Sequence, residues 1–238
     1  MAMDKHIPGI YNWCDKWCEK CSFTSRCRLF ADESKWYEED EDPEAEGFWN
    51  PEDDEEDSQS FQGSDEDEYF EVPEISDEER EAFRQEREIQ ELMVESHPLS
   101  EMGNRYMKQV KEWLDAQLAS GLWDKAKKEN PVLFTPLEVI SYDFTFIPVK
   151  CSRALRDFQM RDDFDRELPE EEKFHNGSAK VASLSVKRSL AAWGKLTELL
   201  PEQQHRIRPF QELLEKISEG LEAAFPNAER FIRPGFDD

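Results

Sequence analysis

Four of the five cysteines lie close together near the N-terminus, in the stretch YNWCDKWCEKCSFTSRCRLF, residues 11–30. We expect a cytoplasmic protein, because the first residues lack the apolar stretch of a secretory signal. Thiols in the cytoplasm are kept reduced, and clustered cysteines there more often bind metal than form disulfides. The sequence therefore predicts a metal or metal-cluster site, and its ligands would be Cys14, Cys18, Cys21 and Cys27.

The spacing of these cysteines also suggests how the backbone presents them. Cys14, Cys18 and Cys21 are four and three residues apart, which would place them on one face of an α-helix. The residues SFTSR before Cys27 predict a turn that brings back the fourth thiol. Four thiolates that converge in this way can bind zinc tetrahedrally or hold the corners of a four-iron, four-sulfur cluster. Disulfides or unliganded thiols are the remaining alternatives.

Aromatic residues flank the cysteines and favour an iron-sulfur cluster (4Fe-4S) over zinc. Aromatic side chains shield a cluster from water and tune its potential, whereas shielding matters less to redox-inert zinc. Four-cysteine zinc sites also more often use two well-separated cysteine pairs. We therefore expect a 4Fe-4S cluster, with structural zinc as the alternative. The flanking aromatic residues are Tyr11, Trp13, Trp17, Phe23 and Phe30.

The run CEKCSFTSRC, which contains Cys18, Cys21 and Cys27, resembles the cluster loop of the helix-hairpin-helix DNA glycosylases. The resemblance covers ten residues and implies a four-iron cluster. It does not imply DNA repair, because Cys14 is separated from the run by three residues instead of six, and that family's helix-hairpin-helix motif and catalytic aspartate pattern are not visible. The first three cysteines are also similar to the CxxxCxxC loop of radical-SAM enzymes. That family needs a βα barrel, and this chain shows no alternation of strands and helices.

Other residues that could do chemistry have simpler explanations. Glu202 and His205 show the Glu-x-x-His spacing of di-iron carboxylate bundles, but with 56 acidic residues about one such pair is expected by chance. Asp143 lies in the most apolar segment, where a carboxylate needs a partner or a shifted pKa, and we expect an ion pair with an arginine. We expect Glu138 to cap a helix, Cys151 to be a small buried hydrophobe, and His6, His97 and His175 to lie at helix ends or on the surface.

Beyond Ile75 the apolar residues recur with a helical period. Ser76 and Glu79 form a capping-box pattern that opens a helix running to Pro98. Ser100 would cap a second helix, and Gly121 would end it. The apolar face expected on the first helix consists of Ala82, Phe83, Ile89, Leu92 and Met93.

Three further helices are predicted. Thr135 as N-cap and Pro136 at the first helical position start a helix that Pro148 kinks. Residues 171–200 form a helix rich in small side chains, and Pro201 opens a last helix that ends at Phe225-Pro226. No strand pattern appears, so we predict an all-α fold, an antiparallel helical bundle of four to five helices. The expected domains are a cysteine-rich metal-binding segment 1–30, an acidic linker 31–75 and a bundle 76–238.

The net charge of −26 comes mostly from one segment. Residues 31–75 carry 21 acidic residues and one lysine, which accounts for −20 of that charge. Such dense like charge predicts a largely disordered linker, and its aromatic residues also suit a docking segment for a basic protein partner. Nucleic-acid binding is not expected, because the rest of the chain is also net negative. No apolar run approaches the roughly 20 residues that span a membrane.

These observations leave two classes of function. The first is a soluble helical protein whose iron-sulfur cluster serves redox sensing or electron transfer, with no pattern that indicates a particular reaction. The second is a non-enzymatic interaction module, in which zinc orders the N-terminus and the acidic segment docks a partner. The oligomeric state is not predicted.

Overall fold

The computed structural model of the protein describes residues 5–39, 75–160 and 163–237, and the part described is helical with no β-strand. The all-α prediction is therefore confirmed for these residues. The acidic stretch 40–74, with its predicted disorder and docking role, lies outside them. The α-helices are α1 (Arg28–Glu39), α2 (Asp77–Glu95), α3 (Pro98–Ala119), α4 (Leu122–Glu129), α5 (Pro131–Gln159), α6 (Asp163–Glu167), α7 (Phe174–Leu199) and α8 (Gln204–Ala224).

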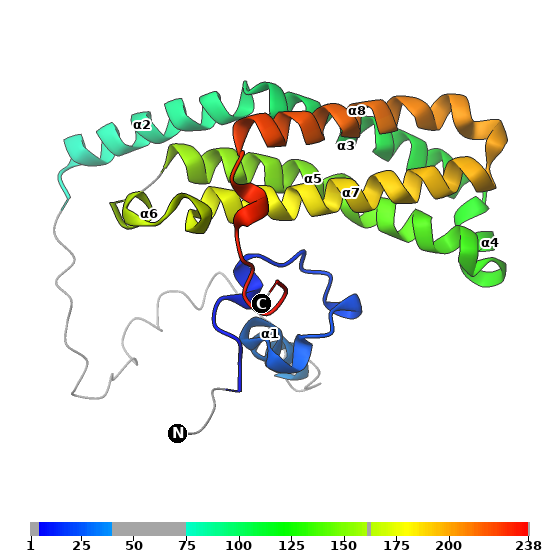
Figure 1. The fold of residues 1–238 in the computed structure, drawn as a ribbon, viewed down its shortest axis with the longest axis horizontal. Helices are drawn as coiled ribbons and strands as arrows, with labels where there is room; N and C mark the ends of the chain where they lie inside the picture. Colours follow the sequence, from blue (N-terminus) through cyan, green and yellow to red (C-terminus); the bar gives the residue numbers. More distant parts are fainter. Residues whose placement is uncertain (1–4, 40–74, 161–162, 238) are drawn as a thin grey trace, which may run out of the picture.

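Helices α5 and α7 lie side by side at the centre of the molecule (Figure 1). Helices α3 and α8 cover one side of this pair, and α2 and α4 pack against α5 toward opposite ends. Helices α3, α5, α7 and α8 alternate in direction along the chain (Figure 1). The N-terminal segment, residues 5–39, and the C-terminal tail, residues 225–237, lie on the other side of α5 and α7. This leaves the four N-terminal cysteines outside the main helical layers.

The main hydrophobic core lies between the helices and uses described residues from Val94 to Ala228 only. At its centre, the Trp193 indole N–H donates a hydrogen bond of 3.0 Å to the Tyr106 hydroxyl, which satisfies both polar groups away from water. Small residues allow the helices to approach closely: a Cβ on Gly103 would lie 3.1 Å from Pro148 of α5. The small side chains of α7 that were noted in the sequence are mostly buried.

The first predicted helix start is confirmed, and the second is wrong. The Ser76 side chain accepts a hydrogen bond from the Glu79 backbone N–H, and the Glu79 carboxylate accepts one from the Ser76 N–H. Helix α3 instead begins at Pro98, and its N-cap is His97, whose Nδ1 accepts a hydrogen bond from the Leu99 N–H. Ser100 is buried in the first turn. Proline at the first helical position loses no helical hydrogen bond, so the helix can start before Ser100.

The predicted start of α5 is also wrong. The helix begins at Pro131, where the Asn130 side chain accepts a hydrogen bond from the Leu133 N–H, and it continues through Pro136 and Pro148. The sequence offers two similar start signals one turn apart, and the earlier start places Leu133 in the core. The Thr135 hydroxyl donates to the Pro131 carbonyl instead of capping the helix. The choice of helix over strand for this segment is confirmed.

Several helices differ from expectation in extent or burial. The sequence pattern did not predict α1, α4 or α6, and α1 occupies residues that we assigned partly to the acidic linker. In α2 only Val94 is buried, because the helix contacts the body mainly near its C-terminal end (Figure 1). Helix α5 is long and apolar enough to cross a membrane, as the core helix of a soluble protein can also be. It contacts four other helices. The side chains of the expected apolar face of α2 that are exposed are Phe83, Ile89, Leu92 and Met93.

Candidate metal centre

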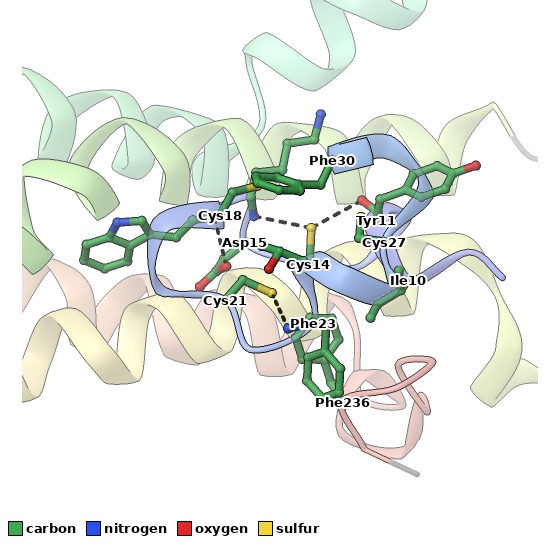
Figure 2. A pocket seen from close by; sticks show the side chains of 13 residues that line it. Ile10, Tyr11, Cys14, Asp15, Cys18, Cys21, Phe23, Cys27, Phe30 and Phe236 are labelled. Atoms are coloured by element: carbon green, nitrogen blue, oxygen red, sulfur yellow. Dashed lines mark hydrogen bonds between the residues drawn. The ribbon is translucent and has the colours of Figure 1, made fainter. Parts of the chain in front are cut away.

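All four N-terminal cysteines line one pocket, which Figure 2 shows from close by. Each of the four side chains is partly buried, and none forms a disulfide. The pocket wall is largely aromatic and aliphatic, and Phe236 from the C-terminal tail closes one side by an edge-on contact with Phe23, with ring centres 5.0 Å apart. The residues that the sequence pattern selected are therefore brought together around one space. The pocket side chains include Ile10, Tyr11, Trp17, Phe23, Phe30 and Phe236.

The cysteines are not on one helix face, so that part of the prediction is wrong. They lie in and between three short 3₁₀ turns, η1 (Ile10–Asn12), η2 (Cys18–Lys20) and η3 (Thr24–Arg26), and Cys27 directly precedes α1. The reason is that Trp13, Asp15 and Trp17 contact Arg153, Arg188 and Tyr142 of the helical body, respectively. Residues two apart on an α-helix point about 200° from each other, so a helix could not deliver all three side chains to one surface.

Backbone N–H groups point at two of the sulfur atoms. The N–H of Lys16 donates to Sγ of Cys14 and the N–H of Phe23 donates to Sγ of Cys21, each over 3.4 Å. Lys16 has φ of 56°, and it is the one non-glycine residue with positive φ among the described residues. Backbone strain of this kind is often found at functional sites. Hydrogen bonds to a sulfur atom stabilise its thiolate form, which is the form that binds metals.

Burial and mutual repulsion act against the thiolates when no cation is present. Burial raises the pKa of the Cys14 and Cys18 thiols above their ordinary value. Negative charge on Cys14, Glu33, Cys21 and Cys27 raises the pKa of the Cys18 thiol further. A positively charged occupant would reverse this effect and release protons on binding.

The thiols surround a space and do not meet at one point. In the part of the chain that the structure describes, no three His, Cys, Asp or Glu side chains are close enough together to hold one metal ion. As they stand, the thiols therefore lack the convergence of a preformed four-ligand site for a single ion. Their chemistry, four sulfur donors around an apolar pocket, fits a metal centre that binds each thiolate at a different atom.

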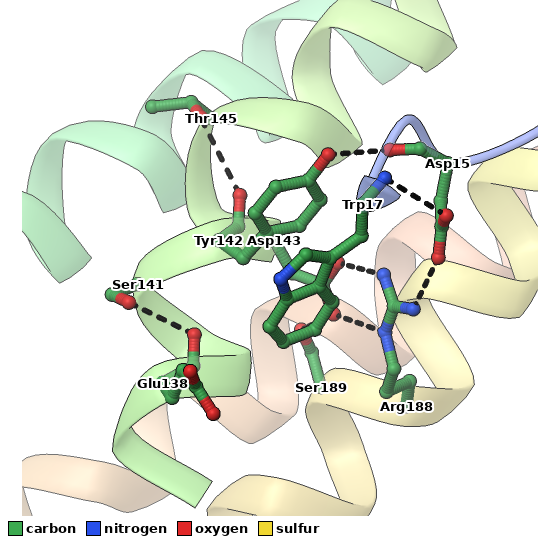
Figure 3. Close-up of polar contacts among 9 residues, drawn as sticks. All are labelled: Asp15, Trp17, Glu138, Ser141, Tyr142, Asp143, Thr145, Arg188 and Ser189. Carbon is green, nitrogen blue, oxygen red and sulfur yellow. Dashed lines mark hydrogen bonds and ion pairs between the residues drawn. The ribbon is translucent and has the colours of Figure 1, made fainter. Parts of the chain in front are cut away.

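The N-terminal segment is anchored along one face of α5. Lys20 forms an ion pair of 2.8 Å with Glu138. The Trp17 ring stacks on Tyr142 with ring centres 4.5 Å apart (Figure 3). The Tyr142 hydroxyl donates a hydrogen bond of 2.6 Å to the Asp15 carbonyl. Further along α5, the Arg153 guanidinium lies 5.8 Å from the centre of the Trp13 ring. These contacts place the cysteine pocket in a fixed position against the body.

Arg188 of α7 joins the segment to the interior of the body. Its guanidinium donates to both carboxylate oxygens of Asp143, at 3.0 and 2.5 Å, and to Asp15 at 2.5 Å (Figure 3). Asp143 is fully buried and also accepts a hydrogen bond from the Ser189 hydroxyl. Burial raises the pKa of the Asp143 carboxyl, and the hydrogen bonds from Arg188 oppose this shift. Burial alone would lower the pKa of Arg188, but its two carboxylate partners hold it above its ordinary value.

The other residues that the sequence marked as candidates are ion-pair partners, helix caps, surface residues or core residues. The ion pair expected for Asp143 is confirmed, whereas the capping role expected for Glu138 is wrong, because its carboxylate binds Lys20. Glu202 and His205 are exposed at the start of the last helix. Cys151 is fully buried, which raises the pKa of its thiol to about 12. His97 is a helix cap as expected, but His175 is buried, with its ring edge-on to Phe158.

Sequence reasoning did not select two residues that shape the site. Arg188 binds Asp15, and Phe236 lines the pocket. Both lie far from the cysteines in the chain, and no local pattern marks either of them.

Comparison with known proteins adds no relative. No protein-family model matches the chain, and no similar curated protein or solved structure was found. The resemblance to the glycosylase cluster loop therefore rests on its ten residues alone.

Proposed function

We propose that Cys14, Cys18, Cys21 and Cys27 bind a four-iron, four-sulfur cluster and that the protein serves redox sensing or electron transfer in the cytoplasm. The observation that carries this proposal is the gathering of all four cysteines around one apolar pocket. Such a cluster supplies a one-electron couple when it is bound. The protein's part is to bind the cluster, to shield it from water and to hold it at a fixed place on the body.

Two features favour the cluster over a single zinc ion. Zinc requires all four sulfur atoms at about 2.3 Å from one point, whereas a cluster takes each thiolate at a separate iron. The described thiols surround a space in which no three of them are close enough for one ion. In addition, the pocket is enclosed by aromatic rings from both ends of the chain, and such a shell controls solvent access to a redox centre.

The position of the pocket supports a role that involves transfer of electrons to or from the outside. The cysteine side chains are only partly buried, so a redox partner can approach the site. The anchors on Glu138, Tyr142 and Arg188 hold the segment in place, which limits reorganisation when the charge of the centre changes.

Anaerobic purification of the full chain tests the proposal. We expect a brown protein with four iron and four sulfide per chain, and substitution of any one of the four cysteines by serine should lower the iron content strongly. Cys151→Ser is the matched control, because its thiol is fully buried in the main core, and it should leave the iron content unchanged. A colourless protein that contains one zinc per chain would instead favour the interaction module.

A further inference from the structure

Helix α2 carries an apolar stripe that the described residues leave uncovered. Ile89, Leu92 and Met93 are 59%, 58% and 55% exposed, and the exposed Ala82 continues the stripe toward the N-terminus of the helix. At about 100° per residue, these four side chains lie about 100–160° around the helix from the buried Val94. The α2 stripe, as we call these four residues, therefore points away from the body, which α2 contacts mainly near its C-terminal end (Figure 1).

The exposure of this stripe is unusual for a helix of this length. Helices in folded proteins gain most of their stability from packing of an apolar face. In α2, however, every residue except Gln90 and Val94 is exposed. Large apolar side chains that gather on one exposed face are typical of an interaction site, and an apolar stripe on a helix suits contact with another helix.

The charged residues of α2 are segregated around the helix. Arg80, Arg84 and Arg87 lie about 140–180° from Ile89, on the side opposite the stripe. Five glutamates, in contrast, lie within about 100° of Ile89. The α2 stripe therefore has acidic flanks and no basic flank. These glutamates are Glu78, Glu79, Glu81, Glu86 and Glu88.

This pattern of charge selects among the possible occupants of the stripe. A second copy of α2 would bring glutamates against glutamates, and an anionic lipid surface would bring phosphates against them. The acidic residues of segment 31–75 have the same sign of charge as the flanks. Like charges across an interface are destabilising, whereas opposite charges on either side of an apolar seam favour the pairing of two helices.

We propose that the α2 stripe docks an amphipathic helix of a partner protein, whose own apolar stripe is flanked by lysine or arginine residues. The α2 stripe runs from Ala82 to Met93, which is about 18 Å of helix. A contact of this length is small for a stable interface, so the complex is transient. The inference does not depend on the metal centre, because it uses only residues of α2.

Fluorescence anisotropy with the full chain at physiological salt tests the apolar part of this surface. The probe is a labelled synthetic peptide of about six turns, which forms a helix with a leucine stripe flanked by lysines. We expect the triple variant Ile89→Ser, Leu92→Ser, Met93→Ser to bind it at least about tenfold more weakly than wild type. Phe83→Ser is the matched control and should stay within about twofold, because the 63% exposed Phe83 lies on the side of Val94. Equal affinity of the triple variant and wild type would overturn the inference.

A second pair of measurements tests the acidic flanks. The same peptide with glutamates in place of its lysines should bind wild type at least about tenfold more weakly. Glu78→Gln combined with Glu88→Gln should weaken binding of the lysine peptide about threefold, and less at high salt. These two residues are chosen because Glu81 already pairs with Arg84 of its own helix, at 2.7 Å. If the glutamate peptide binds as tightly as the lysine peptide, the flanks do not select the partner and the inference is wrong.

Hydrogen exchange locates the binding and tests the other occupants. The lysine peptide should slow exchange in α2, and binding without protection of α2 would contradict the inference. Self-association that the triple variant abolishes, measured by analytical ultracentrifugation, would assign the stripe to a second copy. Binding to phosphatidylglycerol vesicles that the triple variant abolishes would assign it to a membrane. Either result would overturn the proposal of a basic helix. The three substituted residues are exposed, so circular dichroism should show an intact fold in the triple variant.

Discussion

The N-terminal segment and the helical body are held together by different kinds of contact. In the body, long helices bury aliphatic and aromatic side chains in one continuous core. In the segment, short 3₁₀ turns have little core of their own, and individual side chains attach them to residues of α5, α7 and the C-terminal tail. The fastening contacts are an aromatic stack on Tyr142, ion pairs with Glu138 and Arg188, and the packing of Trp13 against Phe231.

The difference shows how a segment with few apolar residues becomes ordered. A stretch of this length usually needs a metal or a partner surface. Here the body supplies such a surface, so the position of the segment depends on residues more than 100 positions away. We therefore expect substitutions in the body core to affect the whole molecule, and substitutions of the residues that contact the segment to act first on the segment.

The largest effect should come from the body core. Trp193→Ala removes a fully buried indole and its hydrogen bond to Tyr106, and we expect the free energy of unfolding to fall by about 3–5 kcal/mol. Chemical denaturation followed by circular dichroism measures this loss. Trp123→Ala, at a partly buried ring on the edge of the core, is the control and should cost less. An equal loss of stability in Trp193→Ala and Trp123→Ala would contradict the central position of Trp193 in the core.

Arg188→Met should disturb both regions at once. It leaves the fully buried Asp143 carboxylate without its cation and releases Asp15, so we expect a loss of about 3 kcal/mol, at the low end for a buried pair because Arg188 is 31% exposed. Hydrogen exchange should also become faster in residues 5–39. Adding Asp143→Asn should restore much of the stability, because no buried charge then remains unpaired. If the double variant is no more stable than the single one, the ion pair is not the cause.

The loss in Arg188→Met should depend on pH. Burial raises the pKa of Asp143 in the wild-type protein, and removal of the guanidinium should raise it further. A carboxyl group with a raised pKa destabilises the folded state above that pKa, where it must be charged. The penalty disappears as the pH falls toward about 3.9, the pKa of the unfolded side chain. Unfolding measured from pH 7 down to pH 4 should therefore show a shrinking difference between Arg188→Met and wild type.

Gly177→Ala probes the contact between Trp13 and α7. A Cβ at Gly177 would lie 2.5 Å from the Trp13 ring and 2.8 Å from the Phe231 ring, so we expect Trp13 to be displaced at a cost of about 1–3 kcal/mol. Gly194→Ala in the same helix is the matched control, because nothing lies within 4 Å of its added Cβ. The control should gain about 0.5–1 kcal/mol from helix propensity. Tryptophan fluorescence and thermal unfolding measure the two effects, and equal gains in the two variants would mean that Trp13 does not lie against Gly177.

The smallest effect should come from the C-terminal tail. Phe236→Ala removes the edge-on contact with Phe23 at the cysteine pocket, which is worth about 1 kcal/mol. We expect faster hydrogen exchange near Phe23 and an unchanged unfolding midpoint of the body. Phe83→Ala, at an exposed ring of α2, should change neither quantity. Unchanged exchange in Phe236→Ala would show that the tail does not close the pocket.

Local patterns in the sequence predicted much of the body. Helical periodicity and the Ser76 capping box identified α2, α3, α5, α7 and α8, because helices depend on residues three or four apart. Local signals failed where two possible N-cap residues were equally good, as at Asn130 and Thr135. They also failed where a helix is short, as in α4. They also failed to show that most of the apolar face of α2 is exposed, because burial depends on which neighbour covers a helix.

For the candidate site, the sequence alone determined the four cysteines, their spacing and their aromatic neighbours. The tertiary structure decided how these residues are presented. Trp13, Asp15 and Trp17 each contact α5 or α7, and a single helix over the cysteine segment could not place all three side chains on that surface. It also decided that the distant Phe236 completes the wall of the pocket and that Arg188 anchors Asp15 beside it. The physical reason is that a periodic pattern reports contacts within one turn of chain, whereas ion pairs and ring contacts between segments depend on where the folded helices bring those segments together.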